Sequence, residues 1–458
     1  MEMDQAIGKF IKGTQYVHIV SAVKREELTE VKNISDDYQK KECVKFIPAS
    51  GAATRMFKDL YNYLEDQVET DFIKRFFEQI EVFPFYKDIK NDIDSKGIVK
   101  GTTEYKRAVI ESLLRDRLNY GNLPKALIKM HAYGEVGLTP IDEHIYEGEQ
   151  YLNKEDVKLH FTISKEHETL FEAYVDEALG EKTQVGITHS FQKKGTDTLA
   201  VDMDNKPFVD DGGAILYRAG GHGSLIENLN DLDGDIIFIK NIDNVCHKNQ
   251  VKDTIESKKM LASIGFDVKQ QIDRYVLGIL SDDYDLDEIG LFIKNTLNIV
   301  YKKVLTKEVA LSFLNRPLRV CGMVKNQGEP GGGPFVVDNG DYLDLQICET
   351  SEIDMNDEEM LKILHQSQFF NPVDLICFVK DYKNEKFDLL AYTNQDRYFI
   401  SEKTYKGRKL KALEHPGLWN GAMHHWNTLF VEVPLSTFNP VKSVNDLLRA
   451  GHRESVVK

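Results

Sequence analysis

The sequence predicts an α/β protein with a mixed, mostly parallel sheet that is covered by helices on both faces. Strand-like segments rich in apolar residues occur at 44–47, 157–163 and 235–240, and segments with helical periodicity separate them. Hydrophobic residues make up 41% of the 458 residues and charged residues 29%, which is ordinary globular usage. A chain of this length can bury a large core, and alternating strands and helices favour parallel pairing.

The N-terminal half begins with residues 1–40, which we expect to be helical. The strand at 44–47 runs into a loop of small residues. The next expected elements are, in order, a helical insertion, a strand, a helix and another strand: 57–120, 157–163, 165–179 and 183–190.

The C-terminal half begins with the most apolar strand, 235–240. Helices are expected next, at 248–264, 268–280, 285–299 and 305–314. Strands follow, at 318–325, 342–349, 374–379 and 387–390, and the tail from 440 reads as one short helix. We therefore expect an N-terminal helical segment, an α/β core and a C-terminal β-rich extension, over 1–40, 41–400 and 401–458.

The charge and the cysteines exclude several classes of protein. The formal net charge is −16, from 58 basic and 74 acidic residues, so nucleic acid and anionic membranes are not expected partners. The five cysteines are far apart and form no CxxC pair, which favours reduced core thiols in a cytoplasmic protein. The acidic start does not resemble a signal peptide, and no stretch approaches the roughly 20 apolar residues of a membrane span.

The loop after the first strand is a candidate phosphate site. It contains Ala49, Ser50, Gly51, Ala52, Ala53 and Thr54, and Arg55 follows. A small-residue loop between a strand and a helix start lets backbone N–H groups approach an anion, and the helix dipole assists. Arg55 would add a charge beside the phosphates. The alternative is an ordinary tight turn between a strand and a helix.

Two further residues suit the binding of a phosphate and a metal. Lys125 follows Pro124, which fixes the backbone, and a lysine at such a loop can neutralise a phosphate. Asp243 lies just beyond the most apolar strand, where α/β sheets bind ligands, and a carboxylate there could hold Mg²⁺. The alternatives are a solvated surface lysine and an aspartate that caps the next helix.

Two glycine clusters complete the set of candidate loops. The first contains Gly221, His222 and Gly223 and precedes a helix. The second contains Glu329, Gly331 and Gly332 and follows a strand. Glycines allow positive φ and close approach of the backbone to a ligand, although loop geometry alone could also require them.

Together these segments resemble the sugar-1-phosphate nucleotidyltransferases, the nucleotide-sugar pyrophosphorylases. The stretch from Ala49 to Met56 is similar to the family's GxGTR-M signature, although Ala52 and Ala53 stand where a second glycine or a polar residue is usual. The other matching segments are Pro124-Lys125, Thr139 to Ile145, Gly221 to Gly223, Ile239 to Asn244 and Leu345 to Glu349. The whole chain is expected to belong to a bacterial branch with a domain of unknown function that is related to the UDP-sugar pyrophosphorylases.

The resemblance implies a three-layer α/β/α core like that of the glycosyltransferase A fold. It implies that Arg55 and Lys125 grip phosphates, that Asp243 holds Mg²⁺, and that the loop at 49–54 cradles the nucleotide. Gly221, His222 and Gly223 would read the base, and the sugar would be bound by Glu329, Gly331, Gly332 and Glu349. The implied reaction joins an NTP, with UTP favoured, to a sugar 1-phosphate and releases pyrophosphate.

Two other functions remain open from the sequence. One is a regulatory protein that binds a nucleotide or nucleotide sugar without catalysis. Such a protein would need no metal at the α-phosphate. The other is a glycosyltransferase, which more typically carries an Asp-x-Asp metal pair. Asp243 is followed by Asn244 and Val245, so that pair is absent at this strand end.

Overall fold

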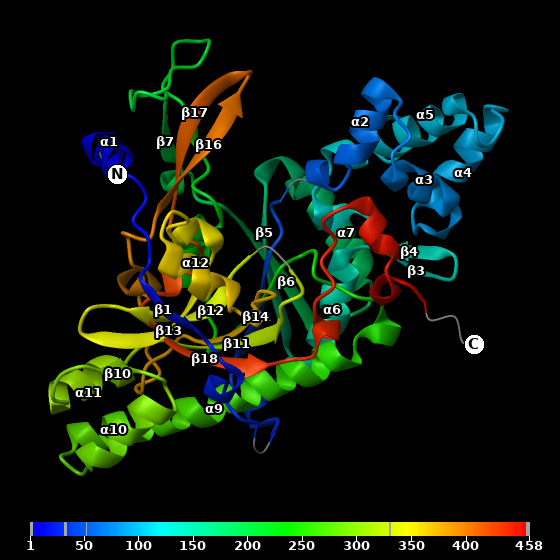
Figure 1. Ribbon diagram of the computed structural model, residues 1–458. Helices are drawn as coiled ribbons and strands as arrows, with labels where there is room; N and C mark the ends of the chain where they lie inside the picture. Colours follow the sequence, from blue (N-terminus) through cyan, green and yellow to red (C-terminus); the bar gives the residue numbers. More distant parts are fainter. Residues whose placement is uncertain (1–2, 32–33, 52, 329–330, 455–458) are drawn as a thin grey trace. The chain divides into compact units, whose positions relative to one another are not determined.

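A computed structural model describes residues 3–31, 34–51, 53–328 and 331–454 (Figure 1). The chain gathers into two compact units, and each unit is built from three separate segments. The first unit comprises Met1–Cys43, Gln192–Ile239 and Lys258–Val433. The second unit comprises Val44–Phe191, Lys240–Ser257 and Pro434–Lys458.

The second unit contains a parallel sheet in the order β2-β5-β6. These strands are β2 (Cys43–Pro48), β5 (Val157–Ile163) and β6 (Val185–Phe191). Two helices belong to the same unit, α6 (Pro140–Tyr151) and α7 (Glu168–Leu179). The strands predicted at 44–47, 157–163 and 183–190 and the helix predicted at 165–179 are thereby confirmed.

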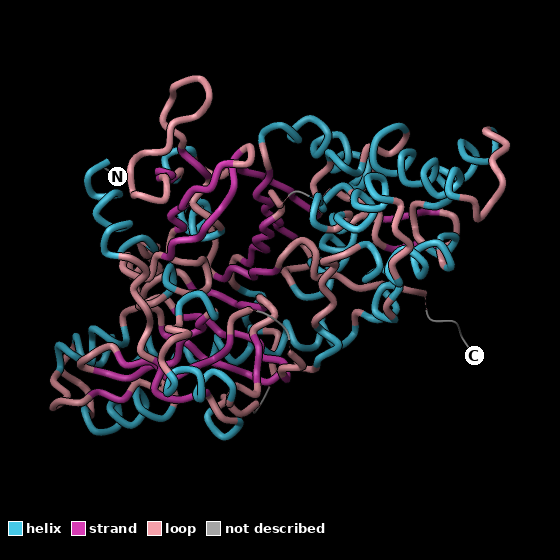
Figure 2. The backbone as a smooth tube through the Cα atoms, turned by 45° about the horizontal axis from the view of Figure 1, so that its top comes forward, coloured by secondary structure: helices cyan, strands magenta, loops and turns pink. Residues whose placement is uncertain are grey.

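The second unit also contains the predicted helical insertion, whose helices lie together in both views (Figures 1 and 2). They are α2 (Lys58–Asp66), α3 (Asp71–Glu78), α4 (Tyr86–Ser95) and α5 (Thr103–Glu111). Buried aromatic residues such as Phe57, Phe76 and Phe85 form their common core. Val441, Val444 and Leu447 from the C-terminal segment belong to the same core. A small hairpin, β3 (His131–Tyr133) with β4 (Val136–Leu138), follows the insertion.

The first unit contains three groups of strands. In the first group the strand order is β14-β11-β15-β9, and a further strand, β18, pairs with β11. The strands of this group are β9 (Ile236–Lys240), β11 (Leu318–Lys325), β14 (Phe369–Phe370), β15 (Asp374–Phe378) and β18 (Asn427–Glu432). The second runs β1-β12-β13-β10: β1 (Ile19–Ala22), β10 (Val300–Tyr301), β12 (Gly333–Asp338) and β13 (Tyr342–Cys348). The third runs β16-β17-β7-β8: β7 (Thr198–Val201), β8 (Tyr217–Arg218), β16 (Phe399–Tyr405) and β17 (Arg408–Glu414).

A mixed α/β fold is confirmed, but the first unit is less parallel than predicted. Only β11 and β18 form a parallel pair among the strand pairs of this unit whose register is described, and the others are antiparallel. Tight turns explain the difference. Lys406 and Gly407 both have positive φ, of 47° and 81°, and link β16 directly to β17. Such two-residue turns match the twist of a hairpin and keep the strands antiparallel.

The helices of the first unit correct one prediction. They are α1 (Met3–Lys12), α8 (Ile226–Asp231), α10 (Leu286–Asn295), α11 (Lys307–Leu314) and α12 (Glu358–His365). One continuous helix, α9 (Lys252–Leu280), replaces the two predicted at 248–264 and 268–280, and it begins in the second unit. Gly265 lies inside α9, and a larger residue would not fit there because its Cβ would lie 2.2 Å from the Phe378 ring. This glycine serves packing and does not end the helix.

Three other elements differ from the prediction. The described part of residues 1–40 is only partly helical, since α1 is followed by β1. The strand predicted at 387–390 is a 3₁₀ turn, Leu389–Tyr392, which the side chain of Asp388 caps through the N–H of Leu390. The tail from 440 forms two 3₁₀ turns, Val444–Leu448 and Ala450–His452, in place of one helix. Within the described residues, no helix has the length and apolar character that crossing a membrane requires.

Candidate functional site

Lys125 and Asp243 form an ion pair in the second unit. The Nζ of Lys125 lies 2.6 Å from Oδ2 of Asp243 and also donates to the carbonyl oxygen of Val441 at 2.7 Å. The side chains are 15% and 21% exposed, so both reach solvent from a largely enclosed position. A lysine ammonium has three N–H donors, and these two contacts use two of them. The structure thus brings together two of the residues that the sequence singled out.

The loop at 49–55 lies beside this pair. The backbone N–H of Lys125 donates to the carbonyl of Gly51 at 3.4 Å, and the N–H of Ala49 donates to Thr162 in β5 at 2.9 Å. A Cβ added to Gly51 would meet no atom within 4 Å, so packing does not explain that glycine. Thr54 and Arg55 are exposed, Ser50 is half-buried and Ala49 is buried. Ala52 lies outside the described residues.

One part of the phosphate-loop prediction is wrong. The loop does not open directly into an α-helix: Ala53–Arg55 forms a single 3₁₀ turn, and α2 begins only at Lys58. Met56 and Phe57 are fully buried in the core of the insertion, and that packing separates the loop from the helix. The N-terminus of α2 therefore does not lie at the loop, so an anion there would gain no support from the dipole of α2.

A buried charged cluster lies under the strand ends. Glu147 of α6 is paired with Lys45 at 3.0 Å and with Lys240 at 2.7 Å, and all three side chains are buried. Burial raises the pKa of Glu147, but Lys240 and Lys45 outweigh it and hold that pKa well below its usual range. The carboxylate therefore stays ionised between the two lysines. The sequence alone gave no sign of this cluster, because its members are about a hundred residues apart.

His144, on the same helix, contacts the turn that carries Asp243. Its Nε2 donates to the carbonyl of Ile242 at 3.2 Å, and the ring is fully buried. Burial, and next the charge of Lys45, lower the pKa of His144 well below its usual value. The ring is therefore neutral near pH 7, with its proton on Nε2 toward Ile242.

A second buried network ties the C-terminal turn to the same unit. Nδ1 of His131 lies 2.9 Å from Oε1 of Glu143, and Nε2 of His131 lies 2.9 Å from Nδ1 of His452. The hydroxyl of Tyr133 donates to Glu143 at 2.7 Å. Burial lowers the pKa of both histidines to about 3 and raises the pKa of Glu143 to about 7. This network holds the C-terminal turn in place and lies too deep to meet a substrate.

The predicted base-reading loop lies in the first unit and is held by the segment after β17. Nδ1 of His222 accepts from the backbone N–H of Leu418 at 3.1 Å, and the ring stacks on Trp419 with centroids 4.4 Å apart. Burial lowers the pKa of His222 to about 4, so the ring is neutral and carries its proton on Nε2. That nitrogen lies 3.9 Å from Oε1 of Glu349, another predicted ligand.

Glu349 itself is largely enclosed. Burial, and next the charge of Glu352, raise the pKa of Glu349. Glu352 is held by Arg397 at 2.7 Å and by Asn420 at 2.7 Å, which anchors the segment carrying Trp419. His222 and Glu349 are thus brought together, whereas Trp419 was not among the predicted ligands. Only the tertiary contact reveals it, because it lies almost 200 residues from His222.

Most of the other predicted glycines have structural reasons. Gly221 has φ of 79°, and a Cβ on Gly223 would meet the carbonyl of Pro416 at 2.1 Å. Gly331 has φ of 151°, and a Cβ on Gly332 would meet Ile347 at 2.5 Å. These glycines are needed for the fold whether or not a ligand binds. Gly331 lines a cavity of about 270 Å³, and Glu329 lies outside the described residues.

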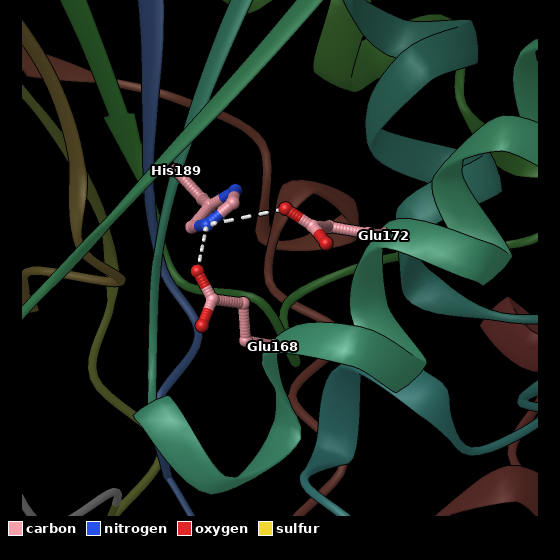
Figure 3. A group of neighbouring side chains, drawn as sticks. All are labelled: Glu168, Glu172 and His189. Atoms are coloured by element: carbon pink, nitrogen blue, oxygen red, sulfur yellow. Dashed lines mark hydrogen bonds and ion pairs between the residues drawn. The ribbon is translucent and has the colours of Figure 1, made fainter.

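One group of possible metal ligands does not include Asp243 (Figure 3). Nε2 of His189 in β6 lies 3.4 Å from Glu168 and 3.9 Å from Glu172, which are one turn apart on α7. Within the described parts of the chain this is the one cluster of three His, Cys, Asp or Glu side chains with such spacing. Glu172 is exposed, and the ring of His189 already contacts both carboxylates.

A family model described as a domain of unknown function, DUF4301, matches residues 3–453. Among curated proteins, none matches the chain. One similar solved structure is a variant of UDP-glucose pyrophosphorylase from Leishmania major in complex with UDP-glucose, with a TM-score of 0.49 and 13% identity, covering 97% of this chain and 73% of that one. Another is UDP-glucose phosphorylase from Trypanosoma brucei, with a TM-score of 0.48 and 13% identity, covering 96% and 72%.

Proposed function

The chain belongs to the DUF4301 family, a domain of unknown function, and we propose that it is a nucleotidyltransferase that joins an NTP to a sugar 1-phosphate. UTP is the favoured NTP, and pyrophosphate is the second product. One observation carries the proposal. Lys125 is held by Asp243 and Val441 and keeps one N–H donor that no contact among the described residues uses, next to a loop whose Gly51 has open space around it.

The proposed reaction needs positioned charge and no protein nucleophile. A phosphate oxygen of the sugar 1-phosphate attacks the α-phosphorus of the NTP, and the bond to the β-phosphate oxygen breaks as pyrophosphate leaves. Lys125 would donate its remaining N–H to an oxygen of the α-phosphate, where negative charge develops. Arg55, which is exposed on the loop, would bind the outer phosphates. Such fixed charges accelerate reactions by stabilising the transition state.

Asp243 fits a magnesium ligand by its chemistry. Mg²⁺ usually takes one or two carboxylates together with waters and substrate phosphates, so one partly exposed carboxylate beside a phosphate loop suffices. When bound there, Mg²⁺ would neutralise phosphate charge. The Lys125 ammonium would stay paired with Asp243 and Val441 and would direct its third donor at the nucleotide.

The resemblance to the nucleotidyltransferases assigns further predicted residues to the base and the sugar. The backbone around Gly221 and Gly223, with His222, would contact the base. Glu349 would bind a sugar hydroxyl, as would Glu329, Gly331 and Gly332. The neutral His222, with its proton on Nε2, would act as a hydrogen-bond donor and not as a cation.

The test is pyrophosphate release from each of the four NTPs with a panel of sugar 1-phosphates and Mg²⁺. The proposal expects release that needs one particular pair of substrates. Binding of nucleotide without release from any pair would contradict it and would favour the regulatory binding protein. Transfer of sugar from a nucleotide sugar to an acceptor, with no pyrophosphate formed, would favour the glycosyltransferase.

A further inference from the structure

The residues on both sides of Asp243 take part in hydrogen bonds made by buried side chains. On one side, His144 donates to the carbonyl of Ile242. On the other side, Oδ1 of Asn244 accepts from the backbone N–H of Asn439 at 2.8 Å. Asn244 is 2% exposed, and its Nδ2 has no hydrogen-bond partner among the described residues. Burying an amide nitrogen without a hydrogen-bond partner costs free energy. The hydrogen bond that Oδ1 accepts from Asn439 therefore determines how the Asn244 side chain is oriented.

The segment that Asn244 holds is the one that contacts Lys125. Residues Asn244 and Pro440 form an isolated β-bridge, and the N–H of Val441 donates to the carbonyl of Asp243 at 3.0 Å. The carbonyl of Val441 then accepts from Nζ of Lys125 at 2.7 Å. Within three residues, the C-terminal segment is fixed to Asn244, fixed to Asp243 and placed against the lysine ammonium.

We propose that Asn244 is a positioning residue for the reaction. It fixes residues 439–441 against the Asp243 turn, and in that way it sets where the Asp243 carboxylate and the Lys125 ammonium lie relative to each other. It touches neither substrate. This inference rests on the proposed function, in which Asp243 holds Mg²⁺ and Lys125 binds the α-phosphate.

The chemistry explains why an amide suits this position. The Asn439 N–H needs an acceptor, and the oxygen of Asn244 provides one from a buried site. A carboxylate in the same place would accept the same bond, but it would put a second negative charge beside Asp243. An aliphatic side chain would leave the N–H of Asn439 without this partner and would free the segment that carries Val441.

The test compares Asn244→Ala with Asn445→Ala. Asn445 is also a buried asparagine of the second unit, 8% exposed, and its Nδ2 donates to the carbonyl of Phe72 at 3.0 Å, away from Asp243. Loss of a group that orients a metal ligand typically costs 10–100-fold in metal affinity. We therefore expect Asn244→Ala to raise the Mg²⁺ concentration for half-maximal rate by about 10–100-fold. Asn445→Ala should lower thermal stability and leave that concentration unchanged.

Two results would overturn the inference. One is a wild-type Mg²⁺ dependence in Asn244→Ala. The other is an equal change in both variants, since that would mean a general loss of packing. If Asn244→Ala does not fold, Asn244→Leu is used in its place, because it keeps most of the side-chain volume but has no acceptor oxygen. The same rise in the Mg²⁺ concentration for half-maximal rate is expected.

A readout without turnover separates this inference from the proposed function. Hydrogen exchange of the amides of Asn439 and Val441 is measured without nucleotide in the wild type and both variants. Faster exchange in Asn244→Ala and wild-type exchange in Asn445→Ala would support the role of Asn244 in fixing residues 439–441, even if no pair of substrates reacts. Unchanged exchange in Asn244→Ala would contradict the positioning role of Asn244, whatever the enzyme assay shows.

Discussion

At the scale of single residues, the proposed chemistry depends on how Lys125 is held. An unrestrained lysine is a flexible point charge and pays an entropic cost when it binds a phosphate. Here Asp243 and Val441 fix the ammonium before any ligand arrives. Such preorganisation is what electrostatic catalysis requires, because the charge need not reorganise as the reaction proceeds.

Replacing the lysine tests this role. We expect Lys125→Met to lower the rate of pyrophosphate release by about 10²–10³-fold, as loss of one positioned donor does. Lys129→Met is the matched control, because Lys129 also pairs with an aspartate, but with Asp88, at 2.8 Å, in place of Asp243. The steady-state rates of both variants are compared with the wild type. An equal fall in both would mean that lost ion pairs in general, and not the site, slow the reaction.

A second residue-scale prediction concerns acid stability. Burial, and next the charge of His131, lower the pKa of His452 to about 3 from a usual value of 6.5. The unfolded chain therefore takes up the proton first as the pH falls, so the folded state loses stability between pH 6.5 and pH 3. One such group contributes at most about 1.4 kcal/mol per pH unit. Glu143, whose pKa burial raises to about 7, acts in the opposite direction between pH 7 and its usual value of 4.5.

Replacing His452 separates its effect on the pH dependence of stability from that of Glu143. The free energy of unfolding of His452→Gln, measured in urea, should fall less steeply than that of the wild type as the pH drops from 6.5 to 4.5. Identical slopes for the two proteins would contradict the buried, neutral state of His452.

The candidate residues differ in how far sequence could identify them. Lys125 and Asp243 could be predicted because each follows a local signal, a proline and a strand end. Asn244 was visible only as a neighbour of Asp243, and Val441 and Trp419 act through contacts with partners some 200 to 300 residues away. Backbone carbonyls carry no sequence signature at all, so the role of Val441 could not have been inferred.

At the scale of elements, α9 shows how a glycine can mislead. A glycine inside a helix usually costs about 1 kcal/mol relative to alanine. Gly265 is retained inside α9 because its backbone packs directly against Phe378 and Val320. The two shorter helices predicted around it are therefore one helix of 29 residues.

Two alanine substitutions test this reading of α9. Gly265→Ala should lower the free energy of unfolding by roughly 1–3 kcal/mol, because overpacking outweighs the gain in helix propensity. Gly8→Ala in α1 is the control, since a Cβ at that position meets nothing within 4 Å. It should leave stability unchanged or raise it by up to about 1 kcal/mol. Urea unfolding of both variants checks the pair, and a stabilised Gly265→Ala would contradict the packing argument.

Elements with strong local patterns were predictable, and those set by distant contacts were not. The strands at 44–47, 157–163 and 235–240 are short segments rich in apolar residues, and each is confirmed within one or two residues. The strand predicted at 387–390 fails because Asp388 caps a turn there. Strands β16 and β17, a hairpin with many polar residues, lie where the sequence predicts a β-rich extension.

At the scale of the whole molecule, neither unit is continuous in sequence. The C-terminal segment 434–458 returns to the second unit, where Val441, Val444, Leu447 and Leu448 enter the core of the helical insertion. The domain boundaries proposed from sequence, at 40 and 400, stay a prediction. A chain that returns in this way cannot be divided by reading local composition, because no linker marks the crossing points.

Removal of the C-terminal segment tests this organisation. Deletion of residues 434–458 should expose the core of the insertion and release Lys125 from Val441. We expect faster proteolysis and faster hydrogen exchange in α2 to α5 than in the full chain. Wild-type protection of these helices in the truncated chain would show that the segment is not part of their core.

The measurement that tests the central claim most directly is the rate of pyrophosphate release by the wild type and by Asp243→Ala, with one NTP and sugar 1-phosphate pair and Mg²⁺. We predict release by the wild type that requires all three components, and a fall of at least about 10²-fold in the variant. Equal rates in the two proteins would contradict the claim that Asp243 and its partner Lys125 form the site of nucleotidyl transfer.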